Sequence, residues 1–204
     1  MRVVRDPDPM CLAEILEDDV ELVEVLDAVP SSVERFAERV ISGHRLGSPM
    51  QRVCAVEEEA DDDTGMTREL GQLATVEGSS EFSAWARYWI DGFAALNDVR
   101  EVGLRLCHLH APMCPRFHVD QVPSRLIVTL AGTGTQWLPD RAVDRDDRSA
   151  MDLRPGSIGT QQLAERSVGL FKGSGFDDGC APGVVHRSPP GREQRLVMTL
   201  DAIL

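Results

Sequence analysis

The sequence predicts an α+β protein of 204 residues, in which a mostly helical N-terminal part packs on a C-terminal part of many short strands. Helical spacing of apolar residues dominates before residue 100, and short β-rich runs follow it. The charge also changes there. Residues 1–100 carry 9 arginines and 22 acidic residues, a net charge of −13, whereas residues 101–204 are neutral overall. We expect the two parts, 1–100 and 101–204, to form one structural domain.

The N-terminal part begins with a segment of ambiguous periodicity. Residues 11–29 fit a short helix followed by either more helix or a strand. Ser31 and Glu34 have the spacing of a capping box, which predicts a helix that starts there and stops at Gly43.

The clearest predicted helix spans Glu81–Asn97, because its apolar residues recur at three- and four-residue intervals. Ser79 or Ser80 is the expected cap. Trp85, Trp89 and Phe93 lie on the apolar stripe, so we expect them to be buried against the strands. The acidic residues of this half are expected at solvent-facing positions.

The C-terminal part contains eight short runs of β-forming residues separated by Gly, Pro and Asp, without a helix-length pattern between them. Such spacing is typical of a sandwich or a barrel. The runs are Val102–Leu109, Phe117–Val119, Arg125–Leu130, Thr135–Leu138, Ser157–Leu163, Ser167–Lys172, Gly183–His186 and Arg195–Leu200.

Composition narrows the functional classes. A net charge of −13 argues against a nucleic-acid partner, because backbone binding needs a basic surface. No apolar run approaches the length that spans a bilayer, and the N-terminus has no signal-peptide core. Five cysteines without a C-x-x-C motif do not suggest a disulfide framework. We therefore expect a cytoplasmic protein without a membrane partner.

The most informative motif is His118-Val119-Asp120. On an extended strand the side chains of His118 and Asp120 share one face. A distant histidine at the end of an apolar run, His186, would complete a set of two histidines and one carboxylate, which suits non-haem Fe(II). The alternative is a hydrogen-bonded His–Asp pair and an unrelated structural histidine.

Longer motifs carry a family resemblance. C-P-R-F-H-V-D, V-P-x-R-L, G-T-G-T-x-W-L-P, F-K-G, G-x-V-H-R-S-P-P and R-L-x-x-T-L-D follow one another in residues 81–204. In this order they resemble the bacterial domain-of-unknown-function family 1826. The resemblance implies a double-stranded β-helix of the jelly-roll or cupin-like kind, similar to Fe(II)/2-oxoglutarate oxygenases. It also implies that the metal ligands are His118, Asp120 and His186.

An oxygenase of this kind needs a cation for the distal carboxylate of 2-oxoglutarate, and Arg195 opens the strand that follows His186. A guanidinium can hold a carboxylate through two hydrogen bonds. The oxygenase pattern often has Ser or Thr two residues later, whereas this chain has Val197. The alternative places Arg195 on the surface, paired with Glu193 or Asp201.

Four further residues are candidates for the surroundings of the metal: Cys114, Arg116, Arg125 and Cys180. Arg116 shares the strand parity of His118, whereas Arg187 would point away from the site. If two arginines face the cavity, the small-molecule substrate is an anion.

The resemblance and the motif together favour a metal-dependent enzyme with a mononuclear centre, similar to a non-haem iron dioxygenase. Fe(II) is the favoured metal over zinc or manganese. One alternative is a cupin-like zinc or manganese protein with hydrolytic or isomerase chemistry. Another is a non-catalytic metal-binding module linked to zinc homeostasis. A separate zinc site at Cys107, His108, His110 and Cys114 has unusual ligand spacing. A homodimer is expected by analogy.

Overall fold

The computed structural model describes residues 2–56, 70–143, 159–179 and 181–203. Among these residues, no helix combines the length and the apolar character of a bilayer-spanning segment.

The elements alternate between strands and helices in the first half and are mainly strands in the second. The strands are β1 (Arg2–Asp6), β2 (Val20–Val25), β3 (Met50–Ala55), β4 (Glu101–Leu109), β5 (Ser124–Ala131), β6 (Gln136–Leu138), β7 (Gln161–Gln162), β8 (Val168–Lys172), β9 (Val185–Arg187) and β10 (Arg195–Ile203). The helices are α1 (Ser31–Ser42) and α3 (Ser79–Asn97), with short 3₁₀ helices η1 (Pro9–Leu16), η2 (Gly71–Thr75), η3 (Asp140–Ala142) and η4 (Phe176–Gly179).

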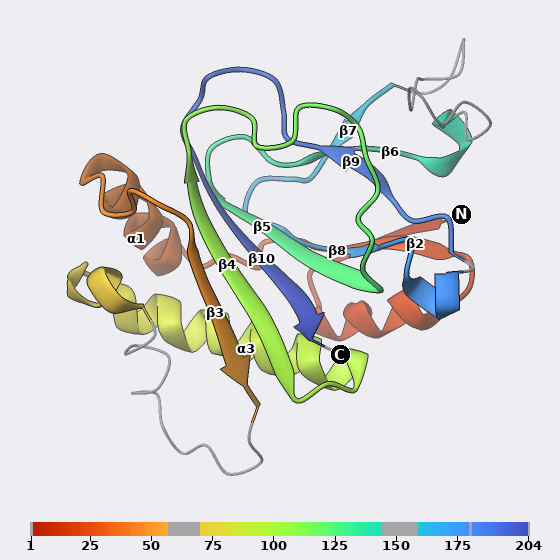
Figure 1. The fold of residues 1–204 in the computed structure, drawn as a ribbon, viewed down its shortest axis with the longest axis horizontal. Coiled ribbons are helices and arrows are strands. Elements are labelled where there is room, and N and C mark those ends of the chain that lie inside the picture. Colours follow the sequence, from red (N-terminus) through yellow and green to blue (C-terminus); the bar gives the residue numbers. More distant parts are fainter. Residues whose placement is uncertain (1, 57–69, 144–158, 180, 204) are drawn as a thin grey trace.

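The strands of the described residues form two sheets (Figure 1). The larger sheet has seven strands in the order β1-β2-β8-β5-β10-β4-β3, and the smaller has the order β7-β6-β9. The paired strands run antiparallel, apart from the parallel pair β1 and β2. The result is a mixed α/β protein, in agreement with the predicted mixture of helices and strands.

The two helices α1 and α3 cover one face of the larger sheet (Figure 1). Phe36 from α1 stacks on Phe82 from α3, with ring centroids 4.7 Å apart. Trp89 is 3% exposed and Phe93 is fully buried, as the apolar stripe predicts. Trp85 is only partly buried, and its indole Nε1 donates a hydrogen bond to the carbonyl of Ala28 at 2.8 Å.

A second apolar cluster joins the two sheets on the other face. Trp137 of β6 packs there with Ile127 of β5, Phe171 of β8 and Val197 of β10. The smaller sheet is therefore anchored by apolar contacts, and polar side chains gather beside this cluster.

The N-terminal part is less helical than predicted, since it supplies β1, β2 and β3 to the larger sheet. The ambiguous residues 11–29 contain η1 and β2. The strand β2 is buried throughout, so Glu21 and Glu24 are buried as well, and the expectation that acidic residues of this half face solvent is wrong at both. The Glu24 carboxylate pairs with Arg5 and accepts a hydrogen bond from the Ser167 hydroxyl, which compensates its burial.

The helix bounds agree with the predictions to within two residues, but the caps do not. The α1 helix starts at Ser31 behind Pro30, without a side-chain cap. Gly78, with a φ of 91°, precedes α3, and Ser79 lies inside the helix, where its hydroxyl donates to the carbonyl of Ala74.

The predicted strand at Phe117–Val119 is reduced to a single bridge between His118 and His186. This bridge links the segment between β4 and β5 to β9 in the smaller sheet. The two histidines of the sequence motifs are therefore neighbours in the fold.

Candidate metal centre

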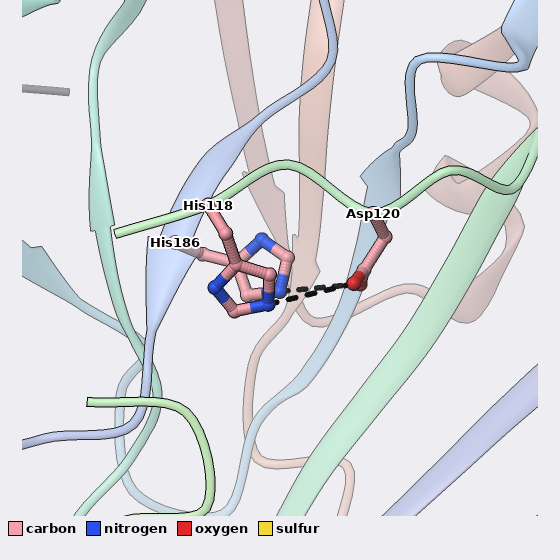
Figure 2. A group of neighbouring side chains, drawn as sticks. All are labelled: His118, Asp120 and His186. Carbon is pink, nitrogen blue, oxygen red and sulfur yellow. Dashed lines mark ion pairs between the residues drawn. The ribbon is translucent and has the colours of Figure 1, made fainter. Parts of the chain in front are cut away.

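Three polar side chains from two distant parts of the sequence converge between the sheets (Figure 2). His118 and Asp120 lie on the segment between β4 and β5, and His186 lies on β9. The His118 Nε2 atom is 3.5 Å from Asp120 Oδ1, and the His186 Nε2 atom is 3.2 Å from Asp120 Oδ2. One ligand atom from each residue lies within 4.8 Å of the other two. No other group of three potential ligands converges in this way in the part of the chain that the structure describes.

Backbone contacts hold these residues together. The amide of each histidine donates to the carbonyl of the other, at 3.0 Å from His118 and 2.9 Å from His186. The carbonyl of Asp120 accepts hydrogen bonds from the amide and the hydroxyl of Ser174. These backbone hydrogen bonds hold the segment of His118 and Asp120 beside β9, although regular strand pairing is limited to one bridge.

Two glycines make this close approach feasible. A Cβ atom on Gly173 would collide with the carbonyl oxygen of Val122, and one on Gly183 would collide with Cγ1 of Val119. Gly183 also has a φ of 70°, which other residues rarely adopt. The glycines of F-K-G and G-x-V-H therefore let the segment that carries His118 and Asp120 lie against the chain that follows β8 and precedes β9.

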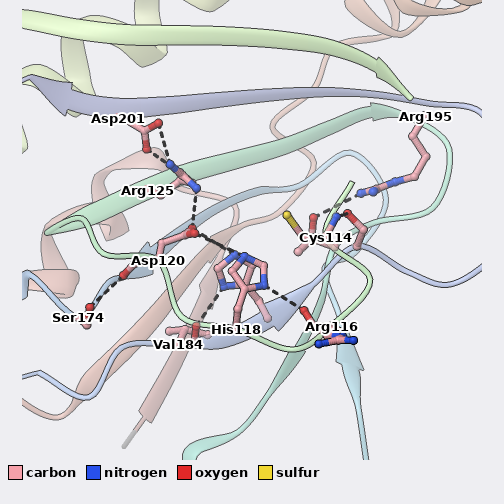
Figure 3. A network of polar contacts seen from close by, with 12 residues as sticks. Cys114, Arg116, His118, Asp120, Arg125, Ser174, Val184, Arg195 and Asp201 are labelled. Atoms are coloured by element: carbon pink, nitrogen blue, oxygen red, sulfur yellow. Dashed lines mark hydrogen bonds and ion pairs between the residues drawn. The ribbon is translucent and has the colours of Figure 1, made fainter. Parts of the chain in front are cut away.

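The hydrogen bonds of the two imidazoles leave the same ring nitrogen available in each (Figure 3). His118 Nδ1 lies 3.1 Å from the carbonyl oxygen of Arg116, and His186 Nδ1 lies 3.0 Å from that of Val184. A carbonyl oxygen only accepts, so each Nδ1 carries the proton and donates it. Both Nε2 atoms then face Asp120, where a protonated imidazole donates to the carboxylate and a neutral one has its lone pair available for a metal ion.

Asp120 is held as a carboxylate. Burial alone would raise the pKa of Asp120, but His118, His186 and the positive charge of Arg125 outweigh burial and hold that pKa far below its usual range. Arg125 Nη1 lies 2.8 Å from Asp120 Oδ2, and the same guanidinium pairs with Asp201 through Nε and Nη2. Asp120 in turn raises the pKa of His118, an effect that burial opposes.

The donor set fits a divalent metal ion. Two atoms bound to one ion at about 2.1 Å can be at most about 4.2 Å apart, and both nitrogen–oxygen distances meet this limit. Asp120 Oδ2 is buried and has no well-aligned hydrogen bond to any described residue, in spite of its close ion pairs. Two imidazoles and one carboxylate with open positions are the ligand set of non-haem Fe(II) sites.

Beside the three residues is a cavity between the sheets, lined by His118, His186 and four arginines, Arg105, Arg125, Arg187 and Arg195. Arg195 of β10 is 5% exposed. Its Nε donates to the carbonyl of Thr133 at 2.7 Å, and its Nη2 donates to the hydroxyl of Thr129 at 3.1 Å. Burial lowers the pKa of Arg195 to about 10, although the charge of Glu193 opposes this effect.

The surface alternative for Arg195 is wrong, because its side chain is buried and lines the cavity. Asp201 pairs with Arg125, and Glu193 accepts a hydrogen bond from the Thr133 hydroxyl. Among the described residues, neither of these carboxylates nor any other forms an ion pair with Arg195. Threonine hydroxyls and a carbonyl oxygen accept its hydrogen bonds instead.

The remaining candidates lie in different places. Arg125 contacts Asp120, and Cys114 lines the cavity with its thiol in the free form. Arg116 contributes its carbonyl, while its side chain is exposed and does not line the cavity. Cys180 lies outside the described residues.

The expectation that Arg187 points away from the site is wrong. Arg187 lines the cavity, and its guanidinium lies 4.2 Å from the centre of the Phe117 ring.

The separate zinc site near Cys107 is not formed. Cys107 and Cys114 line the cavity, whereas His108 and His110 do not. His108 instead contacts Gln194 through Nε2 and packs against His110.

The sequence interpretation missed two residues near the site, Arg105 and Asp201. Strand parity could have found Asp201, since it shares the face of Arg195, Val197 and Thr199 on β10. Nothing in the local pattern distinguished Arg105 from an exposed arginine.

With this geometry in place, comparison with solved structures identifies the fold class. The chain resembles a rice dioxygenase for auxin oxidation at 12% identity and a TM-score of 0.54, covering 99% of this chain and 83% of that one. It resembles a full-length Neurospora crassa protein, solved in complex with alpha-KG, at 13% identity and a TM-score of 0.52 (98% and 83% covered). A prolyl hydroxylase from Trichoplax adhaerens, in complex with a hypoxia inducible factor peptide, gives 9% identity and a TM-score of 0.51 (95% and 88% covered).

At these identities the similarity shows a shared fold. The family follows from the sequence: the model described as "Protein of unknown function (DUF1826)" matches residues 6–201, and the chain belongs to this family. The family resemblance of the motifs is thereby confirmed. No curated protein matches the chain in sequence.

Proposed function

We propose that this protein is a non-haem Fe(II)/2-oxoglutarate-dependent oxygenase with a double-stranded β-helix core. In this proposal His118, Asp120 and His186 hold the metal, and Arg195 binds the distal carboxylate of 2-oxoglutarate. The observation that carries it is the combination of a converging His-Asp-His set with a buried arginine that lines the adjoining cavity and forms no ion pair with a described carboxylate.

Arg195 supports the second half of the proposal through its energetics. A guanidinium that is buried without a counter-charge is costly, and neutral hydrogen-bond acceptors compensate only part of that cost. A carboxylate bound in the cavity would supply the missing counter-charge for Arg195. The rice and Neurospora structures add fold-level support, because the first is named a dioxygenase and the second was solved with alpha-KG.

Each residue then has a defined task. The two histidines present Nε2 because their Nδ1 protons are held by backbone carbonyls. Asp120 supplies the negative charge, and Arg125 fixes its orientation. Arg195 would align the co-substrate along the cavity. The bound iron would supply the redox chemistry that couples decarboxylation of 2-oxoglutarate to oxidation of a substrate.

The test uses purified chain reconstituted without oxygen with Fe(II), Mn(II) or Zn(II). Metal stoichiometry should be one per chain. Calorimetry on the Zn(II) form, which cannot turn over, should show 2-oxoglutarate binding more tightly than 2-oxobutyrate, because the latter lacks the carboxylate that Arg195 would hold. The Fe(II) form should produce succinate from 2-oxoglutarate in air.

The proposal is wrong if no metal form binds 2-oxoglutarate in preference to 2-oxobutyrate. One bound metal without this preference would instead favour the cupin-like zinc or manganese alternative, in which the metal acts as a Lewis acid.

A further inference from the structure

The cavity beside the proposed metal centre has a charge that contrasts with the rest of the chain. The whole protein carries a net charge of −13. Four arginines line the cavity, and no aspartate or glutamate of the described residues lines it. The cavity is therefore a positively charged site in an acidic protein.

Two of these arginines already have a role. Arg125 is neutralised by Asp120 and Asp201, and Arg195 is assigned to the co-substrate. The other two, Arg105 and Arg187, have no carboxylate partner among the described residues. Arg105 is partly buried on β4, on the cavity side of the strand with Cys107 and Leu109.

Arg187 is positioned in a way that suits ligand binding. Its Nε donates to Gln136 Oε1 at 2.9 Å, and its guanidinium stacks on Phe117 at 4.2 Å. These contacts fix the plane of the guanidinium, and Arg187 is one of the residues that line the cavity. A fixed guanidinium loses little entropy when it binds an anion.

The charges do not cancel when the proposed cofactors bind. The four arginines supply four positive charges, and Asp120 and Asp201 supply two negative ones. A divalent metal and dianionic 2-oxoglutarate cancel each other. The cavity then keeps a net charge of about +2, and its low-dielectric walls strengthen the resulting field.

The rest of the lining includes apolar side chains. Leu109, Ile127 and Val197 line the cavity, together with Met113, which is 45% exposed. A ligand that matches both the apolar lining and the net charge of about +2 has an apolar carbon skeleton and two negative charges.

We propose that the primary substrate is a small organic dianion with an apolar skeleton, a dicarboxylate or a phosphate monoester, and that Arg105 and Arg187 recognise its charged groups. This inference rests on the proposed function and assigns the substrate class of the same site. Both ligand types share the chemistry of charge-assisted hydrogen bonds to guanidinium.

The experiment uses the chain loaded with Zn(II) and saturating 2-oxoglutarate, so that the place at Arg195 is filled. Calorimetric titrations compare adipate, hexyl phosphate, hexanoate and hexane-1,6-diol. Affinity should fall from the two dianions to hexanoate to the neutral diol, and the dianion affinity should fall with added salt. Whichever of adipate and hexyl phosphate binds more tightly shows whether the site prefers a dicarboxylate or a phosphate monoester.

Arg105→Gln and Arg187→Gln should each weaken dianion binding at least about tenfold, the loss typical of one charged hydrogen bond. Neither should change the affinity for the diol. Arg192→Gln is the matched control, because Arg192 is exposed on the loop before β10. Metal content is measured for each variant, and affinities are expressed per loaded chain.

The inference is overturned if the diol binds as tightly as adipate, if neither dianion binds, or if the Arg105 and Arg187 variants bind dianions like the parent. A repeat without metal and 2-oxoglutarate separates the two proposals. Dianion binding that depends on Arg105 and Arg187 in a chain that takes up no metal would reject the oxygenase proposal alone. Uptake of metal and 2-oxoglutarate without dianion binding would reject the substrate class alone.

Discussion

The two faces of the larger sheet differ in chemistry although the same strands supply both. On β10, the alternate residues Leu196, Met198 and Leu200 are fully buried in the core on the helix side. Between them, Val197 and Thr199 line the cavity. The strand β4 repeats the pattern, since Leu104 and Leu106 belong to the helix-side core, whereas Arg105, Cys107 and Leu109 line the cavity.

Strand periodicity explains the difference, since alternate side chains point to opposite faces. The helix side gains stability from apolar contacts, and the cavity side keeps polar groups whose burial is costly. The comparison predicts that substitutions on one face change folding free energy and those on the other change ligand binding.

The largest effect is expected from Asp120→Asn. Asparagine keeps the shape but removes the charge, so the chain should lose its bound metal and all turnover. The affinity for Fe(II) should fall by more than the roughly 10–100-fold typical of losing an outer partner of a ligand. Metal analysis after dialysis measures how much metal the variant retains. His110→Gln, which changes an exposed histidine directly after β4, should keep full metal content.

On the helix side, Trp89→Ala should lower the free energy of unfolding by about 3–5 kcal/mol, because Trp89 is 3% exposed in the core. Urea unfolding measures this change. Tyr88→Ala, at a neighbouring position of α3 that is 55% exposed, should cost less than about 1 kcal/mol. Equal losses for the two variants would contradict the described packing of α3.

Arg195→Lys should reduce the affinity for 2-oxoglutarate by about 10–100-fold while the metal content stays constant. Lysine keeps the charge but loses the fork of donors that holds a carboxylate at two points. Calorimetry on the Zn(II) form measures the affinity, with Arg192→Gln as the matched control. An unchanged affinity would remove Arg195 from the co-substrate site.

The smallest effect concerns pH in the metal-free chain. Asp120 raises the pKa of His118 above its ordinary value of 6.5. Protonated His118 therefore favours the folded state, and this contribution is complete below pH 6.5 and disappears as pH rises through the raised pKa. In the presence of a chelator, the parent should lose thermal stability over this range relative to His118→Gln. Metal binding should show the opposite trend, because it requires a neutral imidazole.

The sequence predicted six of the eight C-terminal strands closely, because β-rich runs bounded by Gly, Pro and Asp are local signals. The run at Phe117–Val119 forms only a bridge, and that at Ser157–Leu163 forms only the two-residue strand β7 among the described residues. The sequence also predicted α3 to within two residues at its start. It did not predict that β1, β2 and β3 join the larger sheet. The strand β2 pairs with β8, and β3 pairs with β4. Short stretches of sequence contain no signal for pairing between strands that are far apart along the chain.

The spacing of His118 and Asp120 suggested a common face, and His186 was added as a distant histidine at the end of an apolar run. The structure brings the three side chains together. Their environment was harder to predict. The role of Asp201 depends on register between β5 and β10, where it opposes Arg125. The position of Arg187 depends on stacking with an aromatic ring, which strand parity does not describe.

The backbone carbonyls that hold the Nδ1 protons of His118 and His186 have an evolutionary consequence. Each Nδ1 proton is held by a main-chain carbonyl two residues earlier, a group that every amino acid possesses. Replacement of the side chains at Arg116 or Val184 therefore leaves the tautomer intact. Divergence can therefore proceed at the exposed Arg116 without loss of this support, whereas Val184 is constrained by its burial in the apolar cluster and not by the histidine that it supports.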